Sequence, residues 1–376
     1  MLTSDFDYSL PEELIAQEPP QRRASSRMMM LDISSGEASI LPFGEIADFL
    51  RSGDCLTVNN TRVIKARLFA QRPSGAKLEI FLLARNGGVE SYEWSCLIKP
   101  GKRAKPGTEL PLLDKAGAPS KYSIGIVGPK GDGEFLVRLN PAQMDEILAS
   151  CGHIPLPPYI KRSDEAADSE RYQTVYAKEP GSVAAPTAGL HFDSETLQAI
   201  EAKGVKRAEL TLHVGQGTFK PVSAERLEDH KMHSEEYTLP ASTAEILNCT
   251  RKVGGRIMAA GTTSLRVLET CVGPDRLFAP QSGSTSIFIH PPQRPISADI
   301  LLTNFHLPKS TLLMLVCSFA GSREMVLEAY RKAVAERMRF FSYGDCMLLR
   351  GRKEINIAFA GEDSGLPGEA RRRSIA

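Results

Sequence analysis

Apolar and polar residues follow one pattern in the middle of the chain and another on either side of it. Between residues 61 and 152, short apolar runs are separated by Gly and Pro turns such as Pro100-Gly101 and Pro106-Gly107. This pattern predicts several short strands and one helix, and it is typical of a small β-barrel or sandwich. The predicted strands are 77–83, 92–98, 122–127 and 135–139, and the predicted helix is 142–150.

The flanking regions alternate helical and strand-like stretches, which favours a sheet covered by helices. The predicted helices are 10–16, 45–50, 195–202, 243–253, 264–271 and 322–338. The predicted strands are 56–58, 208–214, 256–260, 285–289 and 300–303, and the apolar run 312–320 is a buried helix or strand.

We therefore expect a mixed α/β (α+β) protein in which one domain interrupts another. A larger α/β catalytic domain comprises residues 1–60 and 154–350, and a small β-barrel domain is inserted at 61–153. Residues 351–376 are polar and end in an Arg-rich segment, so we expect a C-terminal tail there.

Composition restricts the cellular compartments in which the protein is expected and the kinds of partner that it is expected to bind. The 376 residues carry 46 basic and 45 acidic side chains, and the seven cysteines are scattered without a C-x-x-C pair, so neither a disulfide framework nor a zinc site is predicted. The N-terminus lacks the features of a signal peptide, and the run 312–320 is too short to span a bilayer. We expect a cytoplasmic protein without a membrane partner.

Charge is unevenly distributed in the predicted barrel. Residues 61–108 contain ten basic and three acidic side chains, an excess of about +7 in a nearly neutral chain. A basic β-module is a plausible RNA-binding surface, although an ordinary solvated face has the same composition. The candidate contacts are Arg62, Arg67, Lys99, Lys102 and Arg103.

Histidines gather in turn-like sequences of the larger domain, where functional groups tend to collect. They are His191, His213, His230, His233 and His306. The segment 230–235 combines two of them with Glu235, but it matches no metal-ligand motif. Acid–base chemistry or hydrogen bonding to a nucleoside is favoured, and no metal is expected.

Three turns that follow predicted strands are candidate ligand sites. Gly215 and Gly217 begin like a dinucleotide-binding turn, but Lys220 and Pro221 exclude that motif. Gly261-Thr262-Thr263 leads from a strand into a helix, whose N-terminal N–H groups attract carboxylates or phosphates. The segment 304–306 offers Asn304 and His306 for reading a base edge or a sugar hydroxyl.

Ten ordered motifs over about residues 1–350 resemble the S-adenosylmethionine:tRNA ribosyltransferase-isomerase family of queuosine biosynthesis. The motifs are Asp7-Tyr8 with Leu10-Pro11, 59–67, 99–103, 172–176, 183–192, 213–219, 230–235, 261–266, 303–311 and 340–345. The resemblance implies a larger α/β domain with an inserted β-barrel. It also implies transfer and isomerisation of the ribosyl group of S-adenosylmethionine onto 7-aminomethyl-7-deazaguanine in tRNA, giving epoxyqueuosine, adenine and methionine.

The chain departs from the family pattern at three positions. Asn60 stands where Asp is usual, Lys65 where Pro is usual, and Pro292 where Gly is usual. Asn60 cannot act as a carboxylate base, so we interpret it as a turn or hydrogen-bonding residue.

From the chemistry that the resemblance implies, we assign proton transfer to His213, His233 and Glu235, with His191 and His306 as second choices. S-adenosylmethionine is consumed as the ribosyl donor, so no other cofactor is expected, and the protein is expected to act as a monomer. The residues expected to bind S-adenosylmethionine are Gly215, Gly217, Thr262, Thr263, Arg266 and Asn304.

Two other functions remain open from the residues. An S-adenosylmethionine-dependent RNA methyltransferase would normally have a Gly-rich strand-to-helix turn near the start of a doubly wound sheet, and no such turn is present. A non-catalytic RNA-binding protein built on the basic barrel would leave the histidine-bearing turns unexplained.

Overall fold

A mixed sheet forms the centre of the larger unit. The computed structural model describes residues 1–86, 91–131, 133–215 and 222–351, and within these ranges nine strands make up this sheet. In spatial order they are β15 (Gln281–Thr285), β13 (Glu235–Leu239), β12 (Lys206–Leu212), β3 (Cys55–Asn59), β14 (Ile257–Ala260), β16 (Ile300–Asn304), β17 (Cys346–Arg350), β1 (Arg27–Asp32) and β2 (Ala38–Pro42).

The four central strands β12, β3, β14 and β16 run parallel, whereas β13, β15 and β2 pair with their neighbours antiparallel. The carboxyl ends of the parallel strands therefore lie at one edge of the sheet. Ligands of open α/β sheets bind at this edge. The fold thus selects the region in which a site is expected.

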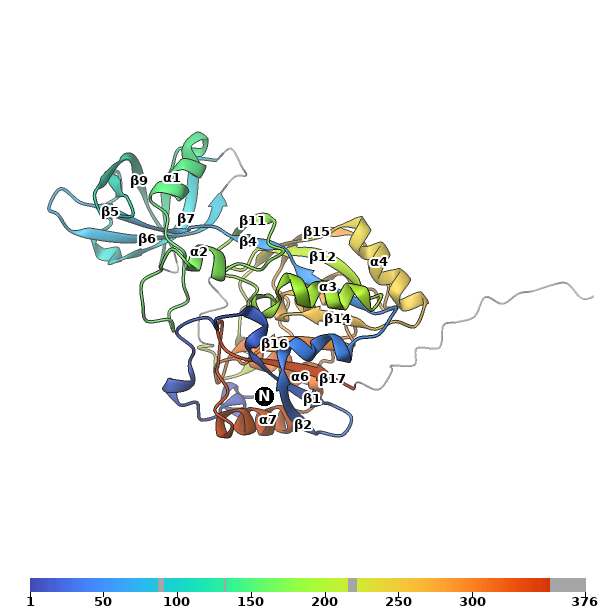
Figure 1. The fold of residues 1–376 in the computed structure, drawn as a ribbon. Helices are drawn as coiled ribbons and strands as arrows, with labels where there is room; N and C mark the ends of the chain where they lie inside the picture. Colours follow the sequence, from blue (N-terminus) through green and yellow to red (C-terminus); the bar gives the residue numbers. More distant parts are fainter. Residues whose placement is uncertain (87–90, 132, 216–221, 352–376) are drawn as a thin grey trace, which may run out of the picture.

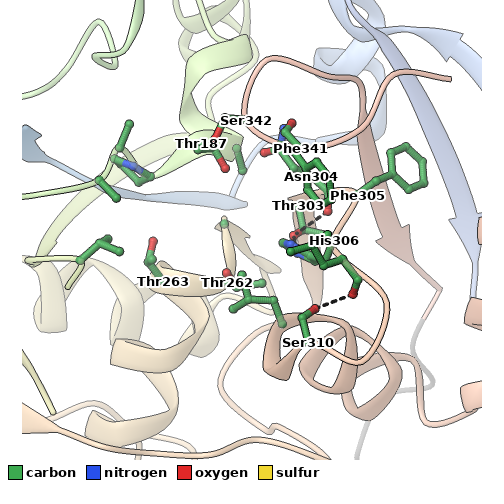
Figure 2. Close-up of a pocket in the computed structure, with 18 of the residues that line it drawn as sticks. Thr187, Thr262, Thr263, Thr303, Asn304, Phe305, His306, Ser310, Phe341 and Ser342 are labelled. Carbon is green, nitrogen blue, oxygen red and sulfur yellow. Dashed lines mark hydrogen bonds between the residues drawn. The ribbon is translucent and has the colours of Figure 1, made fainter. Parts of the chain in front are cut away.

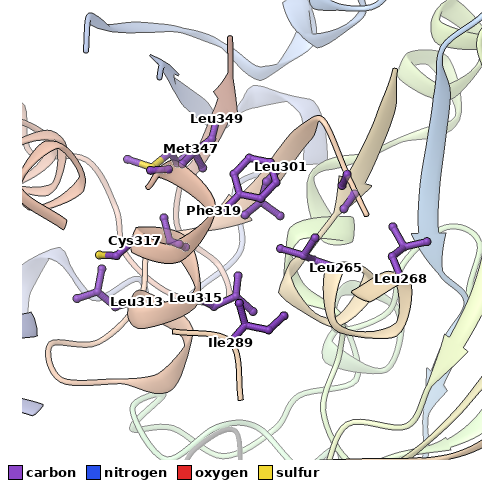
Figure 3. Close-up of a cluster of buried hydrophobic side chains, with 14 of the residues drawn as sticks. Leu265, Leu268, Ile289, Leu301, Leu313, Leu315, Cys317, Phe319, Met347 and Leu349 are labelled. Carbon is purple, nitrogen blue, oxygen red and sulfur yellow. The ribbon is translucent and has the colours of Figure 1, made fainter. Parts of the chain in front are cut away.

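Both faces of the central sheet are buried, so strands such as β14 consist of apolar residues on both faces. Along β14, Ile257 and Ala259 point into one hydrophobic cluster, and Met258 and Ala260 point into another. The first cluster lies under α4 (Ala241–Lys252), α5 (Thr262–Cys271), α6 (Thr311–Ala320) and α7 (Arg323–Ala335), and part of it is drawn in Figure 3. The second lies under α3 (Ser194–Ala202) and the 3-10 helix Phe43–Phe49.

A closed six-stranded barrel forms the smaller unit, which stands apart from the large sheet in Figure 1. Its strands are β5 (Arg67–Gln71), β6 (Lys77–Asn86), β7 (Glu93–Lys99), β8 (Glu109–Leu113), β9 (Pro119–Gly131) and β10 (Glu134–Arg138). Helix α1 (Met144–Ser150) packs into its core through Met144 and Ile147.

The two units are joined at the carboxyl edge of the central sheet. The chain leaves β3 at Asn59, forms β4 (Thr61–Val63) and enters the barrel. After the barrel and the short helix α2 (Asp168–Arg171) it returns through β11 (Glu179–Ser182), which pairs with β4 in parallel. The expected mixed α/β fold with a small barrel is confirmed, and the barrel strands lie inside the predicted insertion at 61–153. The domain boundaries themselves stay a prediction, and the tail beyond residue 351 lies outside the described residues.

Two expected elements are wrong. The predicted helix at 10–16 is only a 3-10 turn at Glu12–Leu14. The strand predicted at 285–289 lies earlier, at Gln281–Thr285, where it pairs with β13. Ile289 is apolar because it packs in the core from an irregular segment, which explains why the run resembled a strand.

No helix in the described ranges is both long and apolar enough to cross a membrane. All seven cysteines are free thiols, and all are buried except Cys249.

Candidate active site

A narrow cavity of about 70 Å³ opens at the carboxyl edge of the parallel strands (Figure 2). It is lined from the ends of β14 and β16, from the start of α5, and from the segments 184–188 and 341–342. None of the described lining residues is Asp, Glu, Lys or Arg. Any charged part of a ligand in the cavity must therefore be met by backbone groups rather than by a charged side chain.

The first wall of the cavity is the start of α5. Gly261 precedes the helix with a φ of +97°, a conformation that residues with a side chain rarely adopt, and no side chain caps the helix there. The hydroxyl of Thr263 accepts a hydrogen bond of 3.3 Å from Asn59 Nδ2. Thr262 and Thr263 both line the cavity, so the uncapped N–H groups of the first helical turn offer a site for an anionic group.

The second wall is the segment that follows β16. Thr303 Oγ1 lies 2.7 Å from His306 Nε2, and the hydroxyl of Tyr8 donates to the carbonyl of His306 over 2.5 Å. Burial lowers the pKa of His306 to about 3. The imidazole is consequently neutral at physiological pH.

An aromatic pair adds a third wall that the sequence did not point to. Tyr159 and Phe341 stack with ring centroids 4.6 Å apart, and both line the cavity. Phe341 has a φ of +68°, which is unusual for a bulky residue and marks a constrained position. Phe341 lies in the motif 340–345, but an apolar residue in a motif cannot be distinguished from an ordinary core residue without the fold.

His191 lies behind this cavity. It is buried in the 3-10 helix Thr187–His191, with Nδ1 2.7 Å from Ser26 Oγ and Nε2 3.2 Å from Asn304 Nδ2. Burial, together with the charges of Arg339 and Arg23, lowers the pKa of His191 to about 3.

His213 lies in a separate polar cleft of about 710 Å³, and its neighbour Val214 lines the cavity. His213 Nδ1 is 2.8 Å from Thr61 Oγ1, and burial lowers its pKa. Gly181 makes room for the ring, because a Cβ there would lie 2.8 Å from His213 Cε1. Asn60 lines the same cleft and accepts a hydrogen bond of 2.7 Å from Thr211, which confirms its interpretation as a hydrogen-bonding residue.

Glu235 and Arg266 contact each other and do not line the cavity. The two side chains form an ion pair and are each only 5% exposed. Glu235 also accepts a hydrogen bond of 2.9 Å from the backbone N–H of Gly215. The arrangement joins β13, α5 and the end of β12, so it has an evident structural role.

His233 is exposed to solvent, and Gly217 lies outside the described residues. Within the described ranges, no three His, Cys, Asp or Glu side chains gather as a metal site would require.

The candidate RNA-binding residues differ in how exposed their side chains are. Arg62, Lys99, Lys102 and Arg103 are exposed around the entry to the barrel and on its turn Gly101–Arg103. Arg67 is only partly exposed and is held by other protein groups: its Nε lies 3.3 Å from Glu79, and its Nη2 donates to the carbonyl of Leu156.

Known proteins resemble this chain over nearly its whole length. A protein named S-adenosylmethionine:tRNA ribosyltransferase-isomerase from Geobacter sulfurreducens is 48% identical over 351 residues, which cover 93% of this chain and 100% of the relative. A protein of the same name from Acetivibrio thermocellus is 48% identical over 353 residues, again 93% and 100% of the two chains.

A solved structure supports the same relationship. The crystal structure of an S-adenosylmethionine tRNA ribosyltransferase from Thermotoga maritima matches with a TM-score of 0.51 and 37% identity, covering 92% of this chain and 100% of that one. The family model described as queuosine biosynthesis protein matches residues 3–349. The chain therefore belongs to the queuosine biosynthesis protein family.

Proposed function

We propose that this enzyme transfers and isomerises the ribosyl group of S-adenosylmethionine onto the aminomethyl group of 7-aminomethyl-7-deazaguanine in tRNA. The products are epoxyqueuosine in tRNA, free adenine and methionine. The observation that carries the proposal is the similarity to ribosyltransferase-isomerases along the full length of those relatives. The convergence of the family motifs 261–266, 303–311 and 340–345 on one cavity supports it.

The cavity is proposed to bind S-adenosylmethionine. Its apolar and aromatic wall at Tyr159 and Phe341 suits the adenine ring. The uncapped start of α5 at Thr262 and Thr263 suits the methionine carboxylate, which the helix dipole attracts. Arg266 lies one turn further along α5, where its ion pair with Glu235 helps to hold the helix in place.

Proton transfer is proposed to involve His306 first. Among the described residues it is the one predicted catalytic side chain that lines the cavity. Its position carries this assignment, since a pKa of about 3 makes the neutral ring a weak base for the proton that the positive sulfur makes acidic at the 5′ carbon. His213, in the neighbouring cleft, is the second candidate, for the proton that the attacking amine must lose. The surface position of His233 and the ion pair of Glu235 give them lower priority.

The barrel is proposed to contact the tRNA backbone through Arg62, Lys99, Lys102 and Arg103, whose side chains are exposed. Arg67 is better placed to stabilise the link between the barrel and residue 156. The protein is further proposed to act as a monomer in the cytoplasm.

Product analysis tests the proposed reaction. The protein is incubated with S-adenosylmethionine and tRNA that carries the aminomethyl base, and the small molecules are separated. Release of adenine and methionine in equal amounts is expected. Formation of S-adenosylhomocysteine would instead identify a methyltransferase, and no turnover in the presence of bound tRNA would favour a non-catalytic RNA-binding protein.

A further inference from the structure

The side-chain amide of Asn304 is held in one orientation by two acceptors. Asn304 is 2% exposed at the end of β16 and lines the cavity. Its Nδ2 donates one hydrogen to the carbonyl of Phe341 over 3.0 Å and lies 3.2 Å from His191 Nε2. In the described part of the chain, its Oδ1 is buried and has no hydrogen-bond partner. A buried acceptor without a partner is costly, so it calls for an explanation.

The carbonyl of Phe341 decides which atom of the amide is which, because a carbonyl oxygen can only accept and must therefore face the amide nitrogen. Nδ2 also faces His191 Nε2, so this ring nitrogen must accept, and the neutral ring carries its hydrogen on Nδ1 and donates it to Ser26 Oγ over 2.7 Å. Because the ring is neutral, Nε2 then has a free lone pair and accepts from Asn304 Nδ2. Both hydrogens of the amide are used, and the oxygen remains for a ligand.

We propose that Asn304 Oδ1 selects the 6-amino group of adenine, and that His191 and Ser26 are positioning residues that keep this oxygen available. The inference rests on the proposed function and deepens it by naming the atom that reads the base. A neutral amide oxygen matches a neutral amino group. An ammonium group would be buried without a counter-charge, because no described lining residue is acidic.

The neighbouring wall is consistent with a flat base beside Asn304. The amide is anchored to the backbone of Phe341, whose ring stacks on Tyr159. An occupant that contacts Oδ1 therefore lies next to an aromatic surface. The start of α5, which also lines the cavity, is the part suited to an anion.

The test compares S-adenosylmethionine with an analogue in which hydrogen replaces the 6-amino group. Adenine or purine release is measured with the modified tRNA, and kcat and KM are determined for each donor. The wild-type protein is expected to prefer S-adenosylmethionine by about 10- to 100-fold in kcat/KM, since the analogue leaves Oδ1 unpaired. The variant Asn304→Ala is expected to lose most of this preference.

If His191 and Ser26 position Asn304, variants of these two residues should affect donor use to graded extents. His191→Phe removes the acceptor for Nδ2 and should reduce the preference toward that of Asn304→Ala. His191→Gln, which keeps an acceptor, should retain part of it. Ser26→Ala should raise KM for S-adenosylmethionine more than it lowers kcat, while the matched control Ser25→Ala, at an exposed serine beside it, should change neither. A merely structural role would lower activity toward both donors equally.

The outcomes separate the inference from the proposed function. If wild-type protein releases adenine but accepts both donors equally, the role of Oδ1 is wrong and the proposed function stands. An unchanged preference in Asn304→Ala would also overturn the inference. If no adenine is released from S-adenosylmethionine at all, the proposed function is wrong, and the inference that rests on it is wrong as well. Equal use of both donors by the wild-type protein overturns the inference without any variant, even if a substitution prevents folding.

Discussion

Burial determines what individual histidines can do in this protein. The sequence placed His191 and His306 in turns and treated them as equivalent candidates. In the fold, His306 lines the cavity and His191 supports Asn304 from behind. Both side chains are buried, and each has a pKa of about 3. Their positions in motifs could be predicted from the sequence. Their burial could not, because it arises from contacts with Ser26, Tyr8 and other residues far away in the chain.

The same burial predicts acid sensitivity of the fold. In the unfolded chain a histidine has a pKa near 6.5, so below that pH the unfolded state binds protons that His191 and His306 reject in the folded state. Stability should therefore fall as pH decreases from about 6.5 toward 3, by about 1.4 kcal/mol per pH unit for each ring. Thermal unfolding at pH 7 and pH 5 measures this, and His306→Gln should flatten the dependence. Equal unfolding midpoints at both pH values would contradict the assignment.

Breaking the buried ion pair of Glu235 and Arg266 tests whether Glu235 has a structural role or a catalytic one. Glu235→Ala leaves a guanidinium that is 5% exposed without its partner, so we expect a loss of about 3–5 kcal/mol. Asp48→Asn, in the exposed pair with Lys203, is the control and should cost less than about 1 kcal/mol. Denaturant unfolding compares the two. Full stability of Glu235→Ala together with lost turnover would return Glu235 to the catalytic candidates.

Elements that obey local rules were predicted well, and elements that depend on distant partners were not. Helix α3 begins after Asp193 close to where the sequence indicated. By contrast, β1 at Arg27–Asp32 is rich in methionine, which has no marked strand preference, and it is a strand because it pairs with β17, more than 300 residues away. Two barrel strands, β5 and β8, were also missed, although each pairs with the next strand along the chain.

The start of α3 provides a test at the scale of one element. Asp193 accepts hydrogen bonds from the backbone N–H of Thr196 over 2.8 Å and from its hydroxyl over 2.7 Å. Asp193→Ala should destabilise the protein by about 1 kcal/mol, whereas Asp193→Asn should cost only a few tenths, since Asn also caps helices. Thermal unfolding of both variants checks this. Equal losses would show that charge, rather than capping, holds the helix start.

At the scale of the whole molecule, the barrel is joined to the edge of the sheet at which the cavity opens. This connection explains how a basic module could bring an RNA to the cavity. The sequence predicted both units and their order along the chain. It could not predict which histidine-bearing turns share one cavity, because this depends on the strand order of the sheet.

Neutralising Lys102 and Arg103 together tests the role of the barrel. Since each phosphate contact releases counterions, the double Gln variant should bind tRNA more weakly, and its dependence on log salt concentration should be shallower by about one unit per lost contact. Neutralising Lys252 and Arg331, which are exposed on the larger unit, is the matched control. Titrations at several salt concentrations measure both. Unchanged affinity and slope in the barrel variant would exclude this surface as the RNA contact.

The most direct test of the proposed reaction follows two labels from S-adenosylmethionine. One is placed in the ribose and the other in the methyl group, and the protein is incubated with tRNA that carries the aminomethyl base. Ribosyl transfer predicts that the ribose label enters the tRNA while the methyl label leaves in free methionine. Methyl label in the tRNA, or the absence of ribose label from tRNA that is bound by the protein, would contradict it.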